Sequence, residues 1–596
     1  MKVSMSNPTP LSALRNLLIA QGLDGMIVPR ADAHQSEDCT PHDNKLAWLT
    51  GFSGSAGLAL VLRDRALLFV DGRYQVQARA EVDRNDFEIH HLHNEPLAEY
   101  LQEQVASGAR IAFEPLLMVN SQFETLSATH CELVALDSDP FDVVWQNRPA
   151  APCGIIREMP VEISGERSTQ KRARILDELA KQQADYLPIT LPDNIAWMLN
   201  VRGSDLNMVP VPFSFALLHR TGELEWFVDE KKTQQLPASL LSTLTISPPG
   251  EFLARCQQRA AGKRFLVDKD FAPVALRFVI EQHGGDVIWS ADPITLMKAH
   301  KNETELAGYR ECHEQDGAAW VNFLAWLAHE VPLREAAGNP ITELEAQEKQ
   351  RAYRQQQPGF LEQSFNTISA SAGNAAMCHY HSSEKTNAPV TTQEMYLNDS
   401  GGQYQNGTTD TTRTLAFGPQ EPQRRLHYTA VLKGFLSLIT LQFPSGTQGH
   451  QLDAFTRRAL WDLGLDYDHG AGHGVGHQLL IHEQPHRIAK KVNPWPLVAG
   501  NIITIEPGYY LAGQYGIRIE NQVEIVESRP GFCKFATLTL VPIDLSLVEL
   551  HLLSEAEKLW IDEYHQQVRE TLSPRVESNA RPWLFAATAP IRVRAN

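Results

Sequence analysis

Two stretches in the first half of the chain have the same order of hydrophobic and polar positions. Residues 11–20 and 172–179 carry apolar side chains at helical spacing, and each stretch leads into a short apolar run, at residues 25–29 and 186–190. Apolar positions that recur every three or four residues indicate an amphipathic helix, whereas a short continuous apolar run indicates a buried strand. The pattern therefore predicts a helix followed by a strand at the start of two α/β units.

A sequence repeat supports these two units. Residues 47–55 align with residues 196–204, and both segments open on Ala-Trp. In each unit a strand-like run then ends in Phe-Val-Asp, at Asp71 and at Asp229. Agreement at several spaced positions argues against a chance match, and it predicts two similar units in tandem.

The boundaries between units fall in stretches of turn-forming residues. Residues 146–165 contain three prolines, and a second boundary lies near residues 291–301. At about 150 residues per domain, a chain of 596 residues has room for three or four units. We predict one unit at residues 1–150, a similar one at residues 151–295, and a third at residues 296–596.

In the third unit, strand patterns surround two aspartates. Residues 395–399 and 409–417 are rich in strand-forming residues, and Asn406-Gly407 between them is a strong hairpin signal. A hairpin with a two-residue loop at Asn406-Gly407 is therefore predicted.

That loop would fix where the two aspartates lie. Gln403 would face Asp410, and Asp399 would be four residues away from Gln403 on the same face. About 13 Å of strand would separate the aspartates, so a bulge or bend at Gly401-Gly402 would have to bring them together.

Five residues of the third unit have oxygen or nitrogen atoms that suit divalent cations. Each stands in its own string: Leu-Asn-Asp399-Ser-Gly, Thr-Thr-Asp410-Thr-Thr-Arg, Gly-His473-Gly, Ile-Glu506-Pro-Gly and Ile-Glu520-Asn. Four carboxylates and one imidazole carry a formal charge of about −4, which two divalent cations would neutralise. Burying the carboxylates unpaired would cost several kcal/mol apiece. The set predicts the ligands of a two-metal hydrolase.

Taken singly, two of these residues have simpler interpretations. Asp399 before Ser-Gly could be an ordinary turn residue. In the alternating segment that ends Arg518-Ile519-Glu520, Arg518 and Glu520 share one face of a strand, which is also typical of a surface ion pair. The metal-ligand interpretation is favoured only when all five strings are taken together.

A histidine-rich stretch contains a second metal motif, which we reject. Residues 482–486 match HExxH, the zinc-protease pattern, in which two histidines share one face of a helix. Pro485 would cost such a helix about 3 kcal/mol, and the alternating glycines of residues 470–476 disfavour a helix there too. Five histidines within residues 469–486 nevertheless favour chemistry over structure in this stretch.

The composition of the chain argues against some classes of binding partner and favours one cellular compartment. The net charge of −18 argues against nucleic-acid and anionic-membrane partners. The seven cysteines are scattered without a CxxC pair, which fits a reducing compartment. We find no secretory signal or membrane-spanning run, so a cytoplasmic location is expected.

The five strings, in this order and with His379-Tyr380 upstream and His482 downstream, resemble the pita-bread metallopeptidase family, and most closely its cytosolic three-domain X-prolyl aminopeptidase branch. The repeated Ala-Trp units and residues 583–591 resemble that branch's N-terminal domains and C-terminal extension. The resemblance implies an α/β (α+β) fold, with two tandem creatinase-type α/β domains followed by a pita-bread catalytic domain.

The resemblance also implies a role for each site residue. Asp399 and Asp410 would bind one cation, and Asp410, His473, Glu506 and Glu520 would bind the other, with Asp410 and Glu520 bridging the two. The imidazoles of His379, His469 and His482 would line the substrate side.

The ligand types and the resemblance together predict the reaction. Carboxylates with one imidazole suit Mn²⁺ and, less distinctively, Co²⁺, Fe²⁺ or Zn²⁺. Two such cations can hold a bridging hydroxide that attacks the scissile carbonyl, with Glu506 taking up the proton and His482 stabilising the oxyanion. The resemblance implies that the substrates are peptides with N-terminal X-Pro, cleaved before proline. A homodimer is expected.

Two other functions stay open. A prolidase, which cleaves X-Pro dipeptides only, has the same metal strings but is usually shorter and lacks the tandem N-terminal units. A metal-free pita-bread module, which binds partners or catalyses a reaction without metals, arises when the ligands are lost, whereas all five are present here.

Overall fold

The computed structural model describes residues 9–591. The chain divides into two compact units, and each is described by itself below. The first unit comprises residues 1–159 and 166–294, and the second comprises residues 160–165 and 295–596. None of the helices within residues 9–591 is long and apolar enough to cross a membrane.

The first unit begins with a six-stranded mixed sheet of order β4-β3-β2-β1-β5-β6. Apolar side chains alternate between its two faces: Met26 and Val28 of β1 belong to one core cluster, and Ile27 belongs to another. Helices cover these faces, for example α1 through Leu11 and α4 through Leu101. The strands are β1 (Gly25–Pro29), β2 (Leu58–Leu62), β3 (Ala66–Val70), β4 (Glu88–His91), β5 (Arg110–Phe113) and β6 (Glu132–Ala135). The helices are α1 (Pro10–Ala20), α2 (Lys45–Thr50), α3 (Gln75–Glu81), α4 (Leu97–Gln104), α5 (Asn120–Ser127) and α6 (Phe141–Val144).

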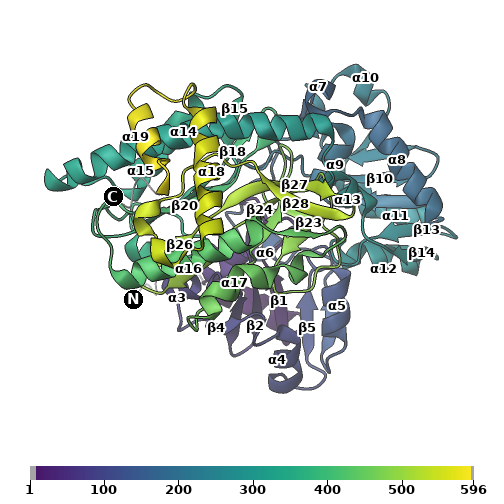
Figure 1. Cartoon of the computed structure of the whole chain (residues 1–596). Helices are drawn as coiled ribbons and strands as arrows, with labels where there is room; N and C mark the ends of the chain where they lie inside the picture. The colour runs from purple at the N-terminus through teal and green to yellow at the C-terminus, as the bar shows by residue number, and fades with distance from the viewer. Residues whose placement is uncertain (1–8, 592–596) are drawn as a thin grey trace. The chain divides into compact units, whose positions relative to one another are not determined.

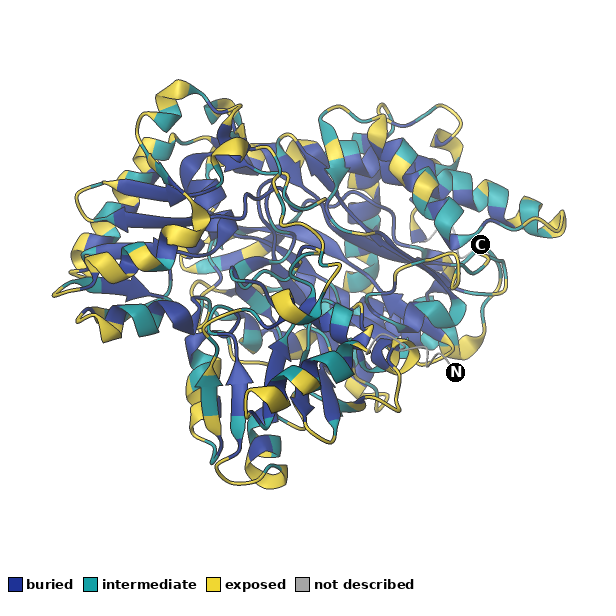
Figure 2. Ribbon diagram, turned by 180° about the vertical axis from the view of Figure 1, so that it is seen from behind, coloured by how far each residue is buried: buried dark blue, intermediate teal, exposed yellow. Residues whose placement is uncertain are grey.

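A second six-stranded sheet, β12-β11-β10-β8-β13-β14, has the same order of equivalent strands. The pairings agree as well, since β1 and β8 each pair antiparallel with one neighbour and parallel with the other. The strands are β8 (Tyr186–Ile189), β10 (Phe215–His219), β11 (Leu224–Phe227), β12 (Thr245–Ser247), β13 (Arg264–Val267) and β14 (Asp286–Trp289). The longer helices are α8 (Ser168–Lys181), α9 (Pro192–Leu199), α11 (Phe252–Arg259) and α12 (Val274–Gln282). Most strands of both sheets are buried, whereas most of the helices have a buried and a more exposed side, and α9 is buried along its whole length (Figure 2).

The predicted internal repeat is therefore confirmed. Its two Ala-Trp segments form α2 and α9, and the aligned residues Gly51 and Asn200 both end their helices in the left-handed conformation. Glycine and asparagine are the residues that adopt this conformation most readily at a helix end. Because both sheets belong to one compact unit, the boundary expected between residues 150 and 151 stays a prediction, as does the one between residues 295 and 296.

The second unit contains three sheets, of order β15-β18-β19, β16-β17-β20 and β21-β28-β27-β24-β22-β23, and a β25-β26 ribbon. Its strands are β15 (Phe360–Gln363), β16 (Ile368–Ser371), β17 (Tyr396–Ser400), β18 (Gly402–Tyr404), β19 (Gly407–Thr408), β20 (Thr411–Leu415), β21 (Gln442–Pro444), β22 (Gly472–Gly474), β23 (Glu483–Ile488), β24 (Ile502–Ile505), β25 (Gly508–Leu511), β26 (Tyr515–Arg518), β27 (Asn521–Arg529) and β28 (Phe532–Thr537). All the strand pairs within these sheets are antiparallel.

The main helices of this unit are α14 (Glu303–Ala336), α15 (Glu343–Gln355), α16 (Pro422–Ile439), α17 (Asp453–Trp461), α18 (Glu555–Leu572) and α19 (Arg581–Ala587). Helices α18 and α19 pack beside α14 (Figure 1). Helix α14 begins at a capping box, in which Asn302 accepts from the amides of the first turn and Glu305 accepts from the Asn302 amide.

The hairpin around the two aspartates is present, but its predicted register is wrong. Gln403 pairs with Thr408 and Tyr404 with Gly407, so the two-residue loop is Gln405-Asn406. Gly407 is needed for close packing against α14 instead of for the turn, because a Cβ there would lie 2.6 Å from Cys312 Sγ.

The shifted register also changes the distance between the aspartates. Strands β17 and β20 pair in the same register as the hairpin, with Asp399 opposite Thr412 and Ser400 opposite Thr411. Asp410 therefore stands two residues, and not four, from the residue that faces Asp399. At Gly401 the two strands come so close that a Cβ would lie 1.8 Å from the Thr409 carbonyl oxygen, which only glycine permits.

Candidate metal centre

All five predicted ligands lie on or next to strands of the second unit. Asp399 is within β17, Asp410 directly precedes β20, and His473 is the middle residue of β22. Glu506 directly follows β24, and Glu520 lies between β26 and β27. Residues that are up to 121 positions apart in sequence are thus presented by antiparallel strands, which hold their backbones rigidly.

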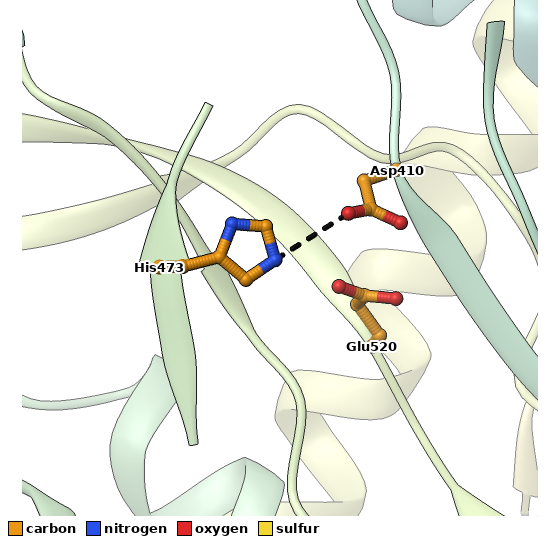
Figure 3. A group of neighbouring side chains, drawn as sticks. All are labelled: Asp410, His473 and Glu520. Carbon is orange, nitrogen blue, oxygen red and sulfur yellow. Dashed lines mark ion pairs between the residues drawn. The ribbon is translucent and has the colours of Figure 1, made fainter. Parts of the chain in front are cut away.

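Asp410, His473 and Glu520 form a buried cluster whose ligand atoms all lie within 4.8 Å of one another. Their side chains point toward one another from three separate strand segments (Figure 3). His473 Nε2 is 3.5 Å from Asp410 Oδ2 and 3.7 Å from Glu506 Oε1. These distances are too long for good hydrogen bonds. They are instead typical of ligand atoms arranged around a common point.

The tautomer of His473 is fixed by its own strand. Its Nδ1 lies 2.8 Å from the Gly474 carbonyl oxygen and donates to it, which leaves Nε2 as the acceptor that faces the carboxylates. The flanking glycines permit close strand packing: a Cβ at Gly472 would lie 2.1 Å from the Thr504 carbonyl oxygen.

Asp399 is held by Arg518, for which a surface ion pair with Glu520 was the simpler interpretation of the sequence. Arg518 is buried and donates from Nη2 to Asp399 Oδ2 at 2.6 Å. The surface ion pair considered between Arg518 and Glu520 is therefore wrong for Arg518, which pairs with Asp399 instead. Arg518 alternates with the buried Ile517 and Ile519, a pattern that would usually place it on an exposed face. Here both faces of the strand are buried, so the pattern did not reveal the pairing with Asp399.

Glu520 is fixed from both its side chain and its backbone. Thr412 donates to Glu520 Oε2 at 2.7 Å, and the buried Arg413 donates to the Glu520 carbonyl oxygen at 2.6 Å. Arg413 also donates to the Asn521 side chain and the Val541 carbonyl oxygen. These contacts orient the carboxylate before any ligand binds.

The electrostatics of the cluster favour bound cations. Burial, followed by repulsion from neighbouring carboxylates, raises the pKa of Asp410, Glu506 and Glu520 well above its ordinary value. Within residues 9–591, Asp399 Oδ1 and Glu520 Oε1 are buried and have no hydrogen-bond partner. Unsatisfied buried oxygens of this kind are costly unless a cation coordinates them. The residues present therefore fit a carboxylate-rich metal centre.

The three further imidazoles predicted to take part are all half-buried. The His482 ring is perpendicular to that of His473 at 4.4 Å between centroids. His469 Nε2 lies 2.9 Å from the Tyr510 hydroxyl, and Arg518 Nη1 donates to the same hydroxyl at 2.6 Å. His379 follows Cys378, whose carbonyl oxygen accepts from Arg518 Nη2 at 3.3 Å. Hydrogen bonds thus connect the neighbourhoods of His379 and His469 to Asp399.

Tyr510 is the functional candidate that sequence reasoning missed. It lies on β25, four residues after Glu506, and its hydroxyl joins His469 to Arg518. Two consecutive tyrosines on a strand are common, so only the position of Tyr510 just after Glu506-Pro-Gly could have drawn attention to it.

The rejection of the HExxH motif is confirmed. Residues 483–488 form strand β23 and not a helix. Glu483 is buried in an ion pair with Lys301, and His486 lies 3.0 Å from the Pro496 carbonyl oxygen. Burial lowers the pKa of His486 to about 4, so this ring is neutral near pH 7.

Comparison with known proteins agrees with this geometry. The model of metallopeptidase family M24 matches residues 307–527, and that of the C-terminal region of these peptidases matches residues 531–591. Two models of the creatinase/prolidase N-terminal domain match residues 10–146 and 147–305.

Full-length relatives give a finer classification. The chain is 35% identical to a probable Xaa-Pro aminopeptidase P of Laccaria bicolor, over 98% of this chain and 93% of that protein. It is 36% identical to one of Aspergillus fumigatus, over 98% of this chain and 92% of that protein. A solved X-prolyl aminopeptidase of Caenorhabditis elegans, described as a cytosolic enzyme with a di-nuclear active site, superposes with a TM-score of 0.92 at 32% identity and covers 98% of this chain and 100% of its own.

The chain therefore belongs to metallopeptidase family M24 and has two creatinase-type N-terminal domains and a pita-bread catalytic domain. The predicted fold class is confirmed. Within the family, the chain belongs to the Xaa-Pro aminopeptidase P group.

A solved Xaa-Pro dipeptidase of Bacillus anthracis shares only the fold. It is 21% identical, with a TM-score of 0.51, and covers 64% of this chain and 99% of its own. The part of this chain that it leaves uncovered agrees with the expectation that prolidases are shorter.

Proposed function

We propose that this enzyme uses two divalent cations to remove the N-terminal residue from peptides that have proline in the second position. The observation that carries the proposal is the buried convergence of Asp410, His473 and Glu520, with Glu506 3.7 Å from the same imidazole nitrogen. The names of the full-length relatives support the substrate class.

Each cation would have its own set of ligands. Asp399 would hold one, His473 and Glu506 would hold the other, and Asp410 and Glu520 would be shared by both. When bound, the cations would lower the pKa of a water molecule enough for it to act as a nucleophile near neutral pH. Mn²⁺ is the metal we propose, because carboxylate oxygens with one imidazole suit it well.

The protein's own side chains would complete the reaction. Glu506, beside the cluster, would take the proton from the attacking water and return it to the proline nitrogen that leaves. His482, next to His473 on the rim of the cluster, would donate a hydrogen bond to the tetrahedral oxyanion. His379 and His469 would contact the substrate, and Arg518 would hold the Asp399 carboxylate in place through their ion pair.

Cleavage before proline has a physical basis. An X-Pro bond has no N–H, so a site that recognises this donor rejects proline. The site proposed here needs instead the free α-amine of the first residue, whose positive charge or lone pair suits an acidic, cation-binding pocket. A homodimer and a cytoplasmic location remain part of the proposal, and the description of the Caenorhabditis elegans relative as cytosolic supports the second.

Peptides X-Pro-Y should be cleaved between X and proline, and an N-acetylated copy of the same peptide should resist. Acetylation removes the amine that would contact the acidic site, so we expect kcat/KM to fall by at least about 10²-fold, the effect of leaving charged site groups unpaired. Mass spectrometry of the products measures the site and the rate of cleavage for both peptides. Rapid cleavage of the acetylated peptide would indicate an endopeptidase, and cleavage of X-Pro dipeptides alone would indicate a prolidase.

The His482→Ala variant should keep its metals and its KM while kcat falls by roughly 10²–10³-fold, the usual effect of losing one oxyanion donor. Metal analysis and steady-state kinetics on the tripeptide measure the two properties separately. His477→Ala is the matched control, because His477 lies on the same stretch but contacts the Asn406 carbonyl oxygen, and it should lose far less. Loss of metal from His482→Ala, or an unchanged kcat, would contradict the assigned role.

A further inference from the structure

Glu343 is a fully buried carboxylate outside the metal centre. It is 0% exposed and occupies the first position of α15. Its Oε1 accepts from the Ser371 amide at 2.6 Å, and its Oε2 accepts from the Ala388 amide at 3.0 Å and the Tyr380 hydroxyl at 2.9 Å. The Asn374 side-chain amide reaches both oxygens, at 3.0 and 3.2 Å. Four donors thus converge on one carboxylate.

All four donors belong to a single segment, residues 371–388, which contains His379. The backbone of Glu343 adds to this attachment, because its amide donates to the Ala388 carbonyl oxygen at 3.0 Å. A segment with little regular structure is thereby tied at both ends and in the middle to the start of α15.

The same segment is fixed from the opposite side by the metal centre. Arg518 donates to the Cys378 carbonyl oxygen at 3.3 Å while it holds Asp399. His379 therefore lies between two residues that are each anchored: Cys378 to Arg518, and Tyr380 to Glu343. Two fixed neighbours leave the backbone of His379 little freedom to reorient its imidazole.

We propose that Glu343 is a positioning residue for the reaction, which holds the His379 imidazole on the substrate side of the metal centre through Tyr380 and the rest of residues 371–388. The inference rests on the substrate-contacting role given to His379 in the proposed function. It assigns to Glu343 no contact with the substrate or the metals.

A carboxylate suits this task better than an amide. Each Glu343 oxygen accepts from a backbone amide, of Ser371 or of Ala388, so the amide group of a glutamine would place its N–H against one of these N–H groups. The charge is kept at a cost, because burial raises the pKa of Glu343 in spite of its hydrogen bonds.

The test uses the full-length, metal-loaded enzyme and the variants Glu343→Gln and Tyr380→Phe, the second of which removes only one donor. We expect unchanged metal content and a kcat/KM for X-Pro-Y that is lower by about tenfold in Glu343→Gln, since hydrogen bonds to a charged group are lost. The loss should divide between kcat and KM as it does in His379→Ala. In a His379→Ala background, Glu343→Gln should change kcat/KM by less than about twofold, because the residue acts through His379.

Glu345→Gln is the matched control. Glu345 lies two residues after Glu343 on the same turn of α15, and it pairs with Arg334 and not with residues 371–388. The kinetics of Glu345→Gln should therefore stay close to those of the unaltered enzyme. A full tenfold loss that persists in the His379→Ala background would overturn the proposal, because Glu343 would then act by another route.

Amide hydrogen exchange gives a readout that needs no substrate. In Glu343→Gln the peptides covering residues 371–388 should exchange at least about tenfold faster, while those covering the strands of the metal centre should not change. Unchanged exchange in residues 371–388 would overturn the inference even if X-Pro-Y is cleaved. If the unaltered enzyme does not cleave X-Pro-Y, the proposed function fails, whereas the exchange result still decides whether Glu343 holds the His379 segment.

Discussion

Hydrolysis of X-Pro-Y is expected to stop when a chelator removes the divalent cations and to return when Mn²⁺ is added. Without cations, the clustered carboxylates repel one another, and no group in the site activates water strongly. Two cations contribute several kcal/mol to such a reaction, so residual activity should be below about 1%. Rates measured before chelation, after it, and after re-addition of Mn²⁺, together with metal analysis, test this.

The loss must come from the missing metals and not from unfolding. Circular dichroism of the chelated protein should therefore show the helix content of the untreated protein. Full activity in a sample shown to be metal-free would refute the two-metal proposal and reopen the possibility of a module that works without metals.

Replacing Glu520 with alanine should reduce turnover by about 10³-fold or more, since a shared ligand contributes to holding both cations. It should also lower the bound metal below two ions per chain. The reason lies in the geometry: Glu520 Oε2 is already held by Thr412, so Oε1 is the atom that remains to coordinate. Kinetics at saturating Mn²⁺ and metal analysis of the purified variant measure the two effects.

Glu524→Gln provides the matched control for this variant. Glu524 lies four residues further along β27 and pairs with the half-exposed Arg310, away from the cluster. Its replacement should leave kcat within about threefold, because the pair lies outside the cluster and the half-exposed Arg310 can be hydrated when the pair is lost. Equal damage from both variants would mean that Glu520→Ala acts through the stability of β27 and not through metal binding.

The five candidate ligands could be recognised from sequence because they occur together, although Asp399 and Glu520 taken singly have simpler interpretations. Four carboxylates within apolar strand patterns have few uses other than binding cations, and the glycines around His473 excluded a helix. The tandem N-terminal units could be predicted for a similar reason, since a helix followed by a strand leaves a local pattern that occurs twice.

Strand register was harder to predict. Asn406-Gly407 is a strong turn signal, yet the turn is Gln405-Asn406, because Gly407 is required for close packing against Cys312 of α14. A tertiary contact thus overrode a local preference. The shift by one residue on each strand brings Asp399 and Asp410 closer than the predicted register would allow.

The sequence by itself determined the fold class and the two repeated N-terminal units and pointed to the five candidate ligands, because these depend on local patterns and on residue chemistry. The tertiary structure alone decided which partners complete the site. Arg518 pairs with Asp399, Tyr510 joins His469 to Arg518, and Glu343 binds the segment that carries His379. Except for the contact between Tyr510 and Arg518, which spans eight residues, each contact joins residues at least 37 positions apart, and their sequence neighbours carry no signal of it. Such contacts exist only once the strands have paired and the charged groups have been buried together.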